Sequence, residues 1–190
     1  MFRENEDYFI KNNMENQQHY GFDLDYRRRD IFSDNNSQDG LYTSLTYFND
    51  IEYITIEDND ELTSTDKKVE SKINYFYDNS EYYSGIYGRY YIDGSKKSND
   101  ETLQELPQLQ FHSYNKELFV DKLIYSLDTK VMNYTRKEGL TANVYEISLP
   151  LSYSEQLIDD YMYTFVENKT IIDKYDYDNF TNPKYKDGTL

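Results

Sequence analysis

Few residues in the chain have the chemistry that catalysis or metal binding requires. Among 190 residues there is no cysteine, and the only histidines are His19 and His112. Without cysteine the chain has no thiolate nucleophile, no thiolate metal site and no disulfide. Two isolated histidines need at least two carboxylates to complete an ordinary zinc site. Glu15 lies four residues before His19, but one such pair is expected by chance among 36 acidic residues. We therefore predict neither a bound metal nor a cofactor.

Paired carboxylates could support acid–base chemistry or calcium binding. Close pairs such as Asp159-Asp160 are expected by chance in so acidic a chain. The acidic stretches 57–61 and 173–178 lack the glycine and the glutamate that an EF-hand loop needs at its sixth and twelfth positions. Nucleophile-elbow, zincin, phosphate-loop and dinucleotide-binding motifs are all missing from the sequence. The sequence therefore predicts a protein that is not an enzyme.

A cluster of tyrosines is the first candidate for a binding surface. Tyrosine is enriched at protein interfaces, so the cluster predicts an adhesive protein surface. Aromatic pairing between neighbouring strands is an alternative explanation. Stacking on nucleic-acid bases would need a cationic groove, and the few nearby cations do not predict one. The members of the cluster are Tyr75, Tyr77, Tyr82, Tyr83, Tyr87, Tyr90 and Tyr91.

The second candidate is the only basic run, Arg27, Arg28 and Arg29. Arginine side chains in this density could hold a phosphate or an acidic partner. Alternatively, the run is a solvated cluster whose charge is balanced by nearby aspartates such as Asp25 and Asp30.

The elements that would position these side chains are mainly strands. Residues 41–48 and 51–57 are rich in β-branched and aromatic residues and predict a hairpin around Asn49-Asp50. Alternating residues predict a second hairpin from Val69 to Ile92, with a bulge or a close backbone approach at its two glycines. Residues 142–149 read as a strand. The segments 161–166 and 170–175 predict a third hairpin.

One main helix is predicted over about 115–135. Phe119, Leu123 and Leu127 recur at intervals of four residues, which is the spacing of one helix face. The fold class expected is therefore α+β: a small antiparallel β-hairpin sheet or partly open barrel with one main helix, an extended N-terminal arm and a C-terminal tail. The domain organisation expected is an extended acidic arm over 1–40, a single β-rich α+β domain over 41–175 and a polar tail over 176–190.

Composition supplies the functional hypothesis. The formal net charge is −16, tyrosine occurs 23 times, and the aliphatic supply is small enough to predict a thin core. No apolar run is long enough to cross a bilayer as a helix, and the first residues do not resemble a signal peptide. The abundance of residues with A/T-rich codons indicates a low-GC genome, as in many phages, large viruses and low-GC bacteria.

Two functions remain from this reasoning. The first is a structural protein of a phage or virus particle, in the tail, the connector or the capsid, that docks through extended arms and tyrosine-rich surfaces. The alternative is an acidic inhibitor that mimics nucleic acid and binds a host defence or nucleic-acid-processing enzyme. The partners expected are other protein subunits, contacted by residues 1–40 and the C-terminal tail, without a membrane and without direct nucleic-acid binding. The location expected is a virion or the host cytoplasm.

Overall fold

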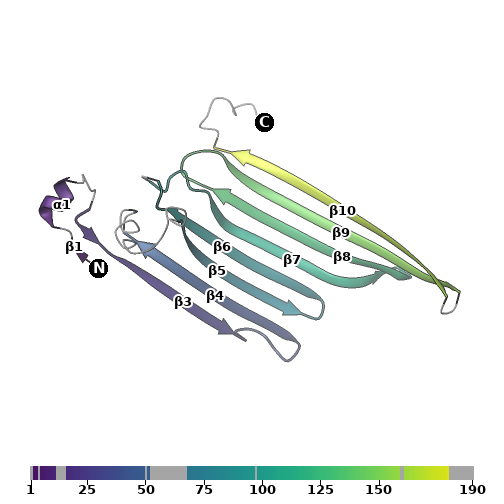
Figure 1. The fold of residues 1–190 in the computed structure, drawn as a ribbon. Coiled ribbons are helices and arrows are strands. Elements are labelled where there is room, and N and C mark those ends of the chain that lie inside the picture. Colours follow the sequence, from purple (N-terminus) through teal and green to yellow (C-terminus); the bar gives the residue numbers. More distant parts are fainter. Residues whose placement is uncertain are drawn as a thin grey trace.

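The computed structural model describes residues 2–3, 5–11, 16–49, 51, 68–96, 98–158 and 161–179. A short helix, α1 (Glu6–Lys11), and a two-stranded sheet of β1 (Phe2–Arg3) and β2 (Gln18–His19) precede a large antiparallel sheet (Figure 1). The large sheet consists of β3 (Gly21–Arg29), β4 (Ser37–Phe48), β5 (Lys68–Asn79), β6 (Tyr82–Asp93), β7 (Gln104–Leu118), β8 (Val120–Thr135), β9 (Thr141–Ile158) and β10 (Met162–Asp178). No helix in these described ranges is long and apolar enough to span a membrane.

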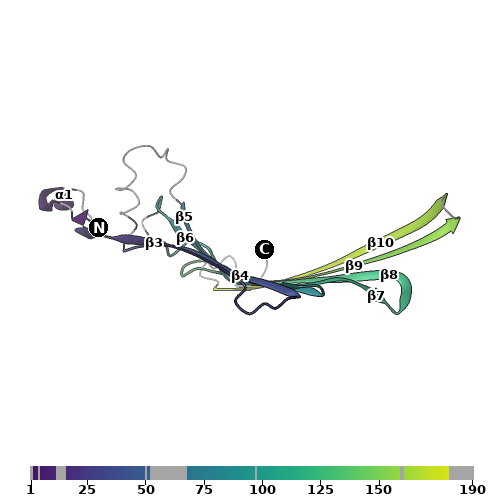
Figure 2. The same ribbon diagram turned by 90° about the horizontal axis from the view of Figure 1, so that it is seen from below.

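The large sheet is an open meander in which each strand pairs with the next one along the chain. Its order runs from β3 to β10, so these two strands are its edges. The expected partly open barrel is therefore wrong. Figure 2 shows the sheet nearly edge-on, as one curved layer. Within the described residues, Val144 is the only buried hydrophobic side chain, so pairing between neighbouring strands, rather than a core between layers, holds this sheet together.

The predicted main helix over 115–135 is wrong, and with it the α+β class. Residues 115–118 lie in β7, and residues 120–135 lie in β8. A spacing of four residues fits a helix, but it is also an even number, and even spacings share one face of a strand. Leu123 and Leu127 therefore lie on one face of β8, together with Tyr125, Thr129 and Val131. The β-branched and aromatic residues of this segment favour the strand.

Other predicted elements have mixed outcomes. The hairpin from Val69 to Ile92 is confirmed as β5 and β6. The strand at 142–149 is confirmed within β9, and residues 41–48 lie in β4. The third hairpin is wrong, because 161–166 and 170–175 fall almost entirely on the single strand β10. Residues 52–57 of the first predicted hairpin lie outside the described residues. Residues 21–29, expected in an extended arm, form β3, an integral edge of the sheet.

A buried carboxylate holds the connection between β3 and β4. Asp39 is 1% exposed, and its two oxygens accept hydrogen bonds from the Ile31 amide at 2.7 Å, the Phe32 amide at 3.1 Å and the Tyr75 hydroxyl at 3.0 Å. Burial alone raises the pKa of Asp39. The hydrogen bonds from the Ile31 amide, the Tyr75 hydroxyl and the Phe32 amide outweigh burial and hold that pKa below its ordinary value. The ionised Asp39 therefore ties this connection to β5.

Candidate functional site

Strand alternation gives the large sheet two chemically different faces. On the first, which we call the apolar face, directly opposed residues form a continuous row across β4 to β9: Leu41, Tyr75, Ile86, Leu109, Val131 and Tyr145. Moving each strand by one residue reaches the other side of the sheet, which we call the polar face. The row there is Gly40, Phe76, Gly85, Gln110, Lys130 and Glu146.

The apolar face is largely uncovered. Four of its isoleucines remain about half exposed: Ile73 at 47%, Ile86 at 54%, Ile147 at 45% and Ile172 at 59%. They come from β5, β6, β9 and β10, so the exposed hydrocarbon extends over most of the sheet. Soluble monomeric proteins rarely expose apolar patches of this extent unless they are binding surfaces. This face is therefore suited to contact with hydrocarbon.

The polar face carries ion pairs between neighbouring strands. Lys130 Nζ lies 3.1 Å from Glu146 Oε1, and Arg89 lies 3.6 Å from Glu70 and 3.4 Å from Glu105. The hydrogen bond with Glu146 raises the pKa of Lys130 above its ordinary value. Each such half-exposed pair contributes only about 0.2–1 kcal/mol. The ion pairs between neighbouring strands named here lie on this face, whereas the apolar face carries one pair within β10, Lys174 and Asp176 at 2.9 Å.

Aromatic rings also stack across strands on the polar face. Tyr42, Phe76 and Tyr83, from β4, β5 and β6, have successive ring centroids 6.1 Å apart and interplanar angles of 11° and 14°. The Tyr83 hydroxyl is hydrogen-bonded to that of Tyr87. Burial raises the pKa of Tyr83, and the Tyr87 hydroxyl raises it further. Gly85 permits this arrangement, since a Cβ atom there would lie 2.6 Å from the Tyr87 ring.

The tyrosine cluster predicted from the sequence is divided between the two faces. Tyr83, Tyr87 and Tyr91 lie on the polar face, by their pairing. Those on the apolar face are Tyr75, Tyr77, Tyr82 and Tyr90. Neighbours in sequence such as Tyr82 and Tyr83 therefore cannot form one surface. Their role as interface residues stays a prediction, and the two sets would form interfaces on opposite faces of the sheet.

The arginine run is divided in the same way. Arg27 and Arg29 lie on the polar face, and Arg28 lies on the apolar face near the end of β3. The Arg29 guanidinium donates a hydrogen bond of 2.9 Å to the Tyr42 hydroxyl. Arg27 lines a pocket of about 330 Å³ with Lys72, and no pattern in the sequence indicates that these two cations lie together. Only the pairing of β3, β4 and β5 brings them to one place.

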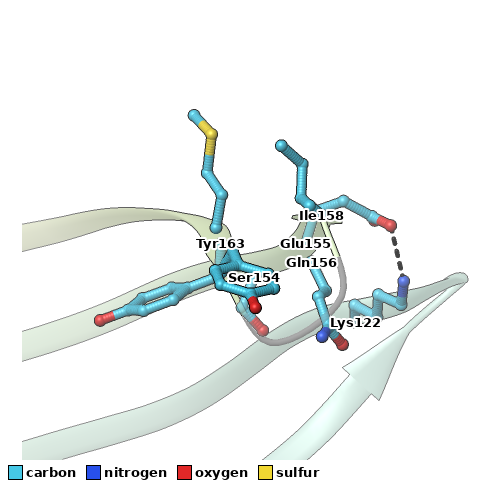
Figure 3. Close-up of a pocket in the computed structure, with 8 residues that line it drawn as sticks. Lys122, Ser154, Glu155, Gln156, Ile158 and Tyr163 are labelled. Carbon is cyan, nitrogen blue, oxygen red and sulfur yellow. Dashed lines mark hydrogen bonds and ion pairs between the residues drawn. The ribbon is translucent and has the colours of Figure 1, made fainter.

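A second pocket, of about 540 Å³, lies where β9 and β10 extend past the end of β8. Figure 3 shows Lys122 reaching Glu155 across this pocket, with Nζ and Oε1 2.7 Å apart. The Tyr153 hydroxyl donates to the other oxygen of Glu155 at 2.6 Å. The bonds from Lys122 and then Tyr153 lower the pKa of Glu155. Because Lys122 is already neutralised, this pocket is less suited to an anion than the one lined by Arg27 and Lys72.

Metal binding finds no geometric support in the part of the chain that the structure describes. No group of three or more histidine, aspartate and glutamate side chains there could hold a metal ion. The acidic stretch 173–178 lies along β10, where successive side chains point to opposite faces. The stretch 57–61 lies outside the described residues.

Comparison with known proteins gives a family match over most of the chain. The family model described as LptD: LPS transport system D matches residues 18–189, a span that contains all eight strands of the large sheet. Among curated proteins, none matches the chain. LPS transport contradicts both functions expected from composition, the virion component and the nucleic-acid mimic. It equally contradicts the expected location in a virion or the host cytoplasm, since the family acts at the outer membrane and periplasm.

Proposed function

Because the chain belongs to the LptD family of LPS transport, we propose that its large sheet provides a two-faced surface for moving lipopolysaccharide. The match carries this proposal, since it covers β3 to β10 as one continuous span. Lipopolysaccharide joins acyl chains to a phosphorylated saccharide. A sheet with hydrocarbon on one face and charges on the other has the matching division of chemistry. The role is transport without a catalytic step, and the lack of catalytic motifs in the sequence supports it.

Protein partners belong to this role, since the family is part of a multi-protein transport complex. Within the proposal, residues 1–40 and 176–190 contact neighbouring subunits. Two exposed side chains in the described part of the first segment support such contacts: Ile10 is 66% exposed and Phe32 is 78% exposed. Hydrophobic side chains at this exposure are suited to anchoring a partner.

A labelling experiment tests the two-faced surface. Because the sequence has no cysteine, a single introduced cysteine takes a fluorophore at one known position. The variants Ile172→Cys and Asp173→Cys place an environment-sensitive fluorophore on adjacent residues of β10 that face opposite sides. Purified lipopolysaccharide should shift the emission at position 172 to shorter wavelength and change that at position 173 much less. Phosphatidylcholine at equal concentration is the control amphiphile and should give a weaker shift.

Two results would contradict the proposal. If lipopolysaccharide leaves both labels unchanged, the sheet does not contact it. If the two labels respond equally, the faces do not divide the ligand as proposed.

A further inference from the structure

We propose that the pocket on the polar face between β3, β4 and β5 binds a hydroxylated anion, namely a sugar that carries a phosphate or a carboxylate. We call it the basic pocket, and its polar-face lining residues are Asp25, Arg27, Tyr42, Ser44, Lys72 and Asn74. The inference rests on the proposed function for one point only: the saccharide of lipopolysaccharide is one source of such a group.

Strand register builds the basic pocket from two adjacent rows. One row crosses the three strands as Asp25, Ser44 and Lys72, and the next as Arg27, Tyr42 and Asn74. Ser44 is the small residue in the middle of its row, so it leaves a depression between the longer side chains on each side. The Tyr42 ring forms a fixed wall, because it stacks on Phe76 and its hydroxyl accepts the Arg29 hydrogen bond.

The charge of the basic pocket is opposite in sign to that of the chain. Arg27 and Lys72 outnumber the single carboxylate of Asp25, whereas the chain carries a net charge of −16. Among the described residues, neither cation has an ion-pair partner, although carboxylates neutralise Arg89, Lys122 and Lys130. A bound anion would pair both free cations.

Asn74 indicates what else the anion carries. Its Oδ1 atom is buried and has no hydrogen-bond partner among the described residues. A buried acceptor without a donor is costly, so a ligand that supplies a hydroxyl group would be favoured there. Bare phosphate carries little donor capacity, whereas a sugar phosphate carries hydroxyls beside its charge. The cations and Asn74 together therefore favour an anionic sugar over a simple anion.

The test measures binding of glucose 6-phosphate to the full chain by calorimetry, in an uncharged polyoxyethylene detergent that contains no sugar. The double variant Arg27→Gln/Lys72→Gln should lose at least about tenfold in affinity, because the loss of one charge-assisted bond alone is worth about that factor. Arg28→Gln is the control, since it removes one positive charge from the opposite face of the strand that carries Arg27. Its affinity should equal that of the unchanged chain.

A third variant tests the part assigned to Asn74. Asn74→Ala should weaken glucose 6-phosphate binding while leaving the weaker binding of inorganic phosphate unchanged. No binding of glucose 6-phosphate to the unchanged chain, or an equal loss in Arg28→Gln, would overturn the inference. Equal affinities for inorganic phosphate and glucose 6-phosphate would also overturn it, because no hydroxyl would then be recognised.

A competition arm separates this inference from the proposed function. The deacylated saccharide of lipopolysaccharide should displace glucose 6-phosphate if the pocket serves transport. Failure to displace it would overturn the link to lipopolysaccharide and assign the pocket to free sugar phosphates. Transport itself is judged separately, by the fluorescence labels on β10, which lie at the other edge of the sheet.

Discussion

Ile172 and Ile171 of β10 offer a test of the apolar face with a built-in control. The two residues are adjacent and similarly exposed, at 59% and 53%, but they lie on opposite faces of the sheet. Ile172 pairs with Ile147 on the apolar face, and Ile171 pairs with Ser148 on the polar face. Replacing either one by threonine keeps a β-branched residue that favours strands. The two variants therefore differ only in which face loses hydrocarbon.

The expected effect follows from the exposed fraction of Ile172. Complete burial of an isoleucine side chain is worth about 1.5–3 kcal/mol. Because 59% of Ile172 is still exposed, covering the remainder with acyl chains would contribute about 0.9–1.8 kcal/mol. Threonine forgoes most of this free energy, so Ile172→Thr should raise the Kd for lipopolysaccharide by about 5- to 20-fold.

The assay is a lipopolysaccharide binding isotherm for each variant, with circular dichroism to confirm an unchanged strand content. Ile171→Thr should bind as the unchanged chain does. An equal loss of binding in Ile171→Thr and Ile172→Thr would contradict face-specific contact, because hydrophobicity alone would then explain the loss. Unchanged binding in Ile172→Thr would show that acyl chains do not cover this face.

Three further outcomes concern the stability of the sheet around β4. Asp39→Asn replaces the charged acceptor of the β3–β4 connection by a neutral amide. Backbone amides within 30–36 should then exchange faster with deuterium, as measured by mass spectrometry, and unchanged exchange would refute this role. The folded pKa of Asp39 is below its ordinary value of about 4, so the stability it contributes is present above that pH and is lost as the pH falls through the folded pKa. Acid titration of the free energy of unfolding should show a drop that Asp39→Asn lacks. Gly40→Val should lower that free energy by about 1–3 kcal/mol in denaturant, because a Cβ atom would lie 2.9 Å from Phe76 and 3.0 Å from Tyr42; an unchanged midpoint would show that the rings move aside.

The sequence predicts local strand structure better than it predicts architecture. The hairpin from Val69 to Ile92 was correct, because alternation and a turn-forming segment are signals contained within it. The bulge or close backbone approach predicted at its two glycines is not found there: the extra residue of the β6–β7 register shift lies in β7, between Glu105 and Gln108, and the group near Gly85 is the Tyr87 side chain. The prediction of a helix over 115–135 was wrong, because residues four apart share one face of a helix and also one face of a strand. Local spacing alone could not decide between them.

The candidate sites required information that the sequence does not contain. Tyr82 and Tyr83 are neighbours in the chain but lie on opposite faces, whereas Arg27 and Lys72 are distant in the chain but line one pocket. Both facts depend on the strand register. Register is set by pairing along the whole sheet, and a shift of one residue would exchange the two faces. The tyrosine cluster and the arginine run, which were identified by proximity along the chain, therefore do not form single surfaces. The same approach could not identify the basic pocket.

A low fraction of hydrophobic residues has a different consequence in a single-layer sheet than in a globular domain. Hydrophobic residues make up 37% of the chain, which predicts a thin core if they must fill the space between two layers. In one layer the same residues need to cover only one face, and the unbroken row from Leu41 to Tyr145 shows that they suffice. The polar face then accounts for the low fraction of hydrophobic residues in the whole chain. Since so large an apolar face is costly in water, the proposed transport role requires acyl chains to cover this face, and the labels on β10 test that contact.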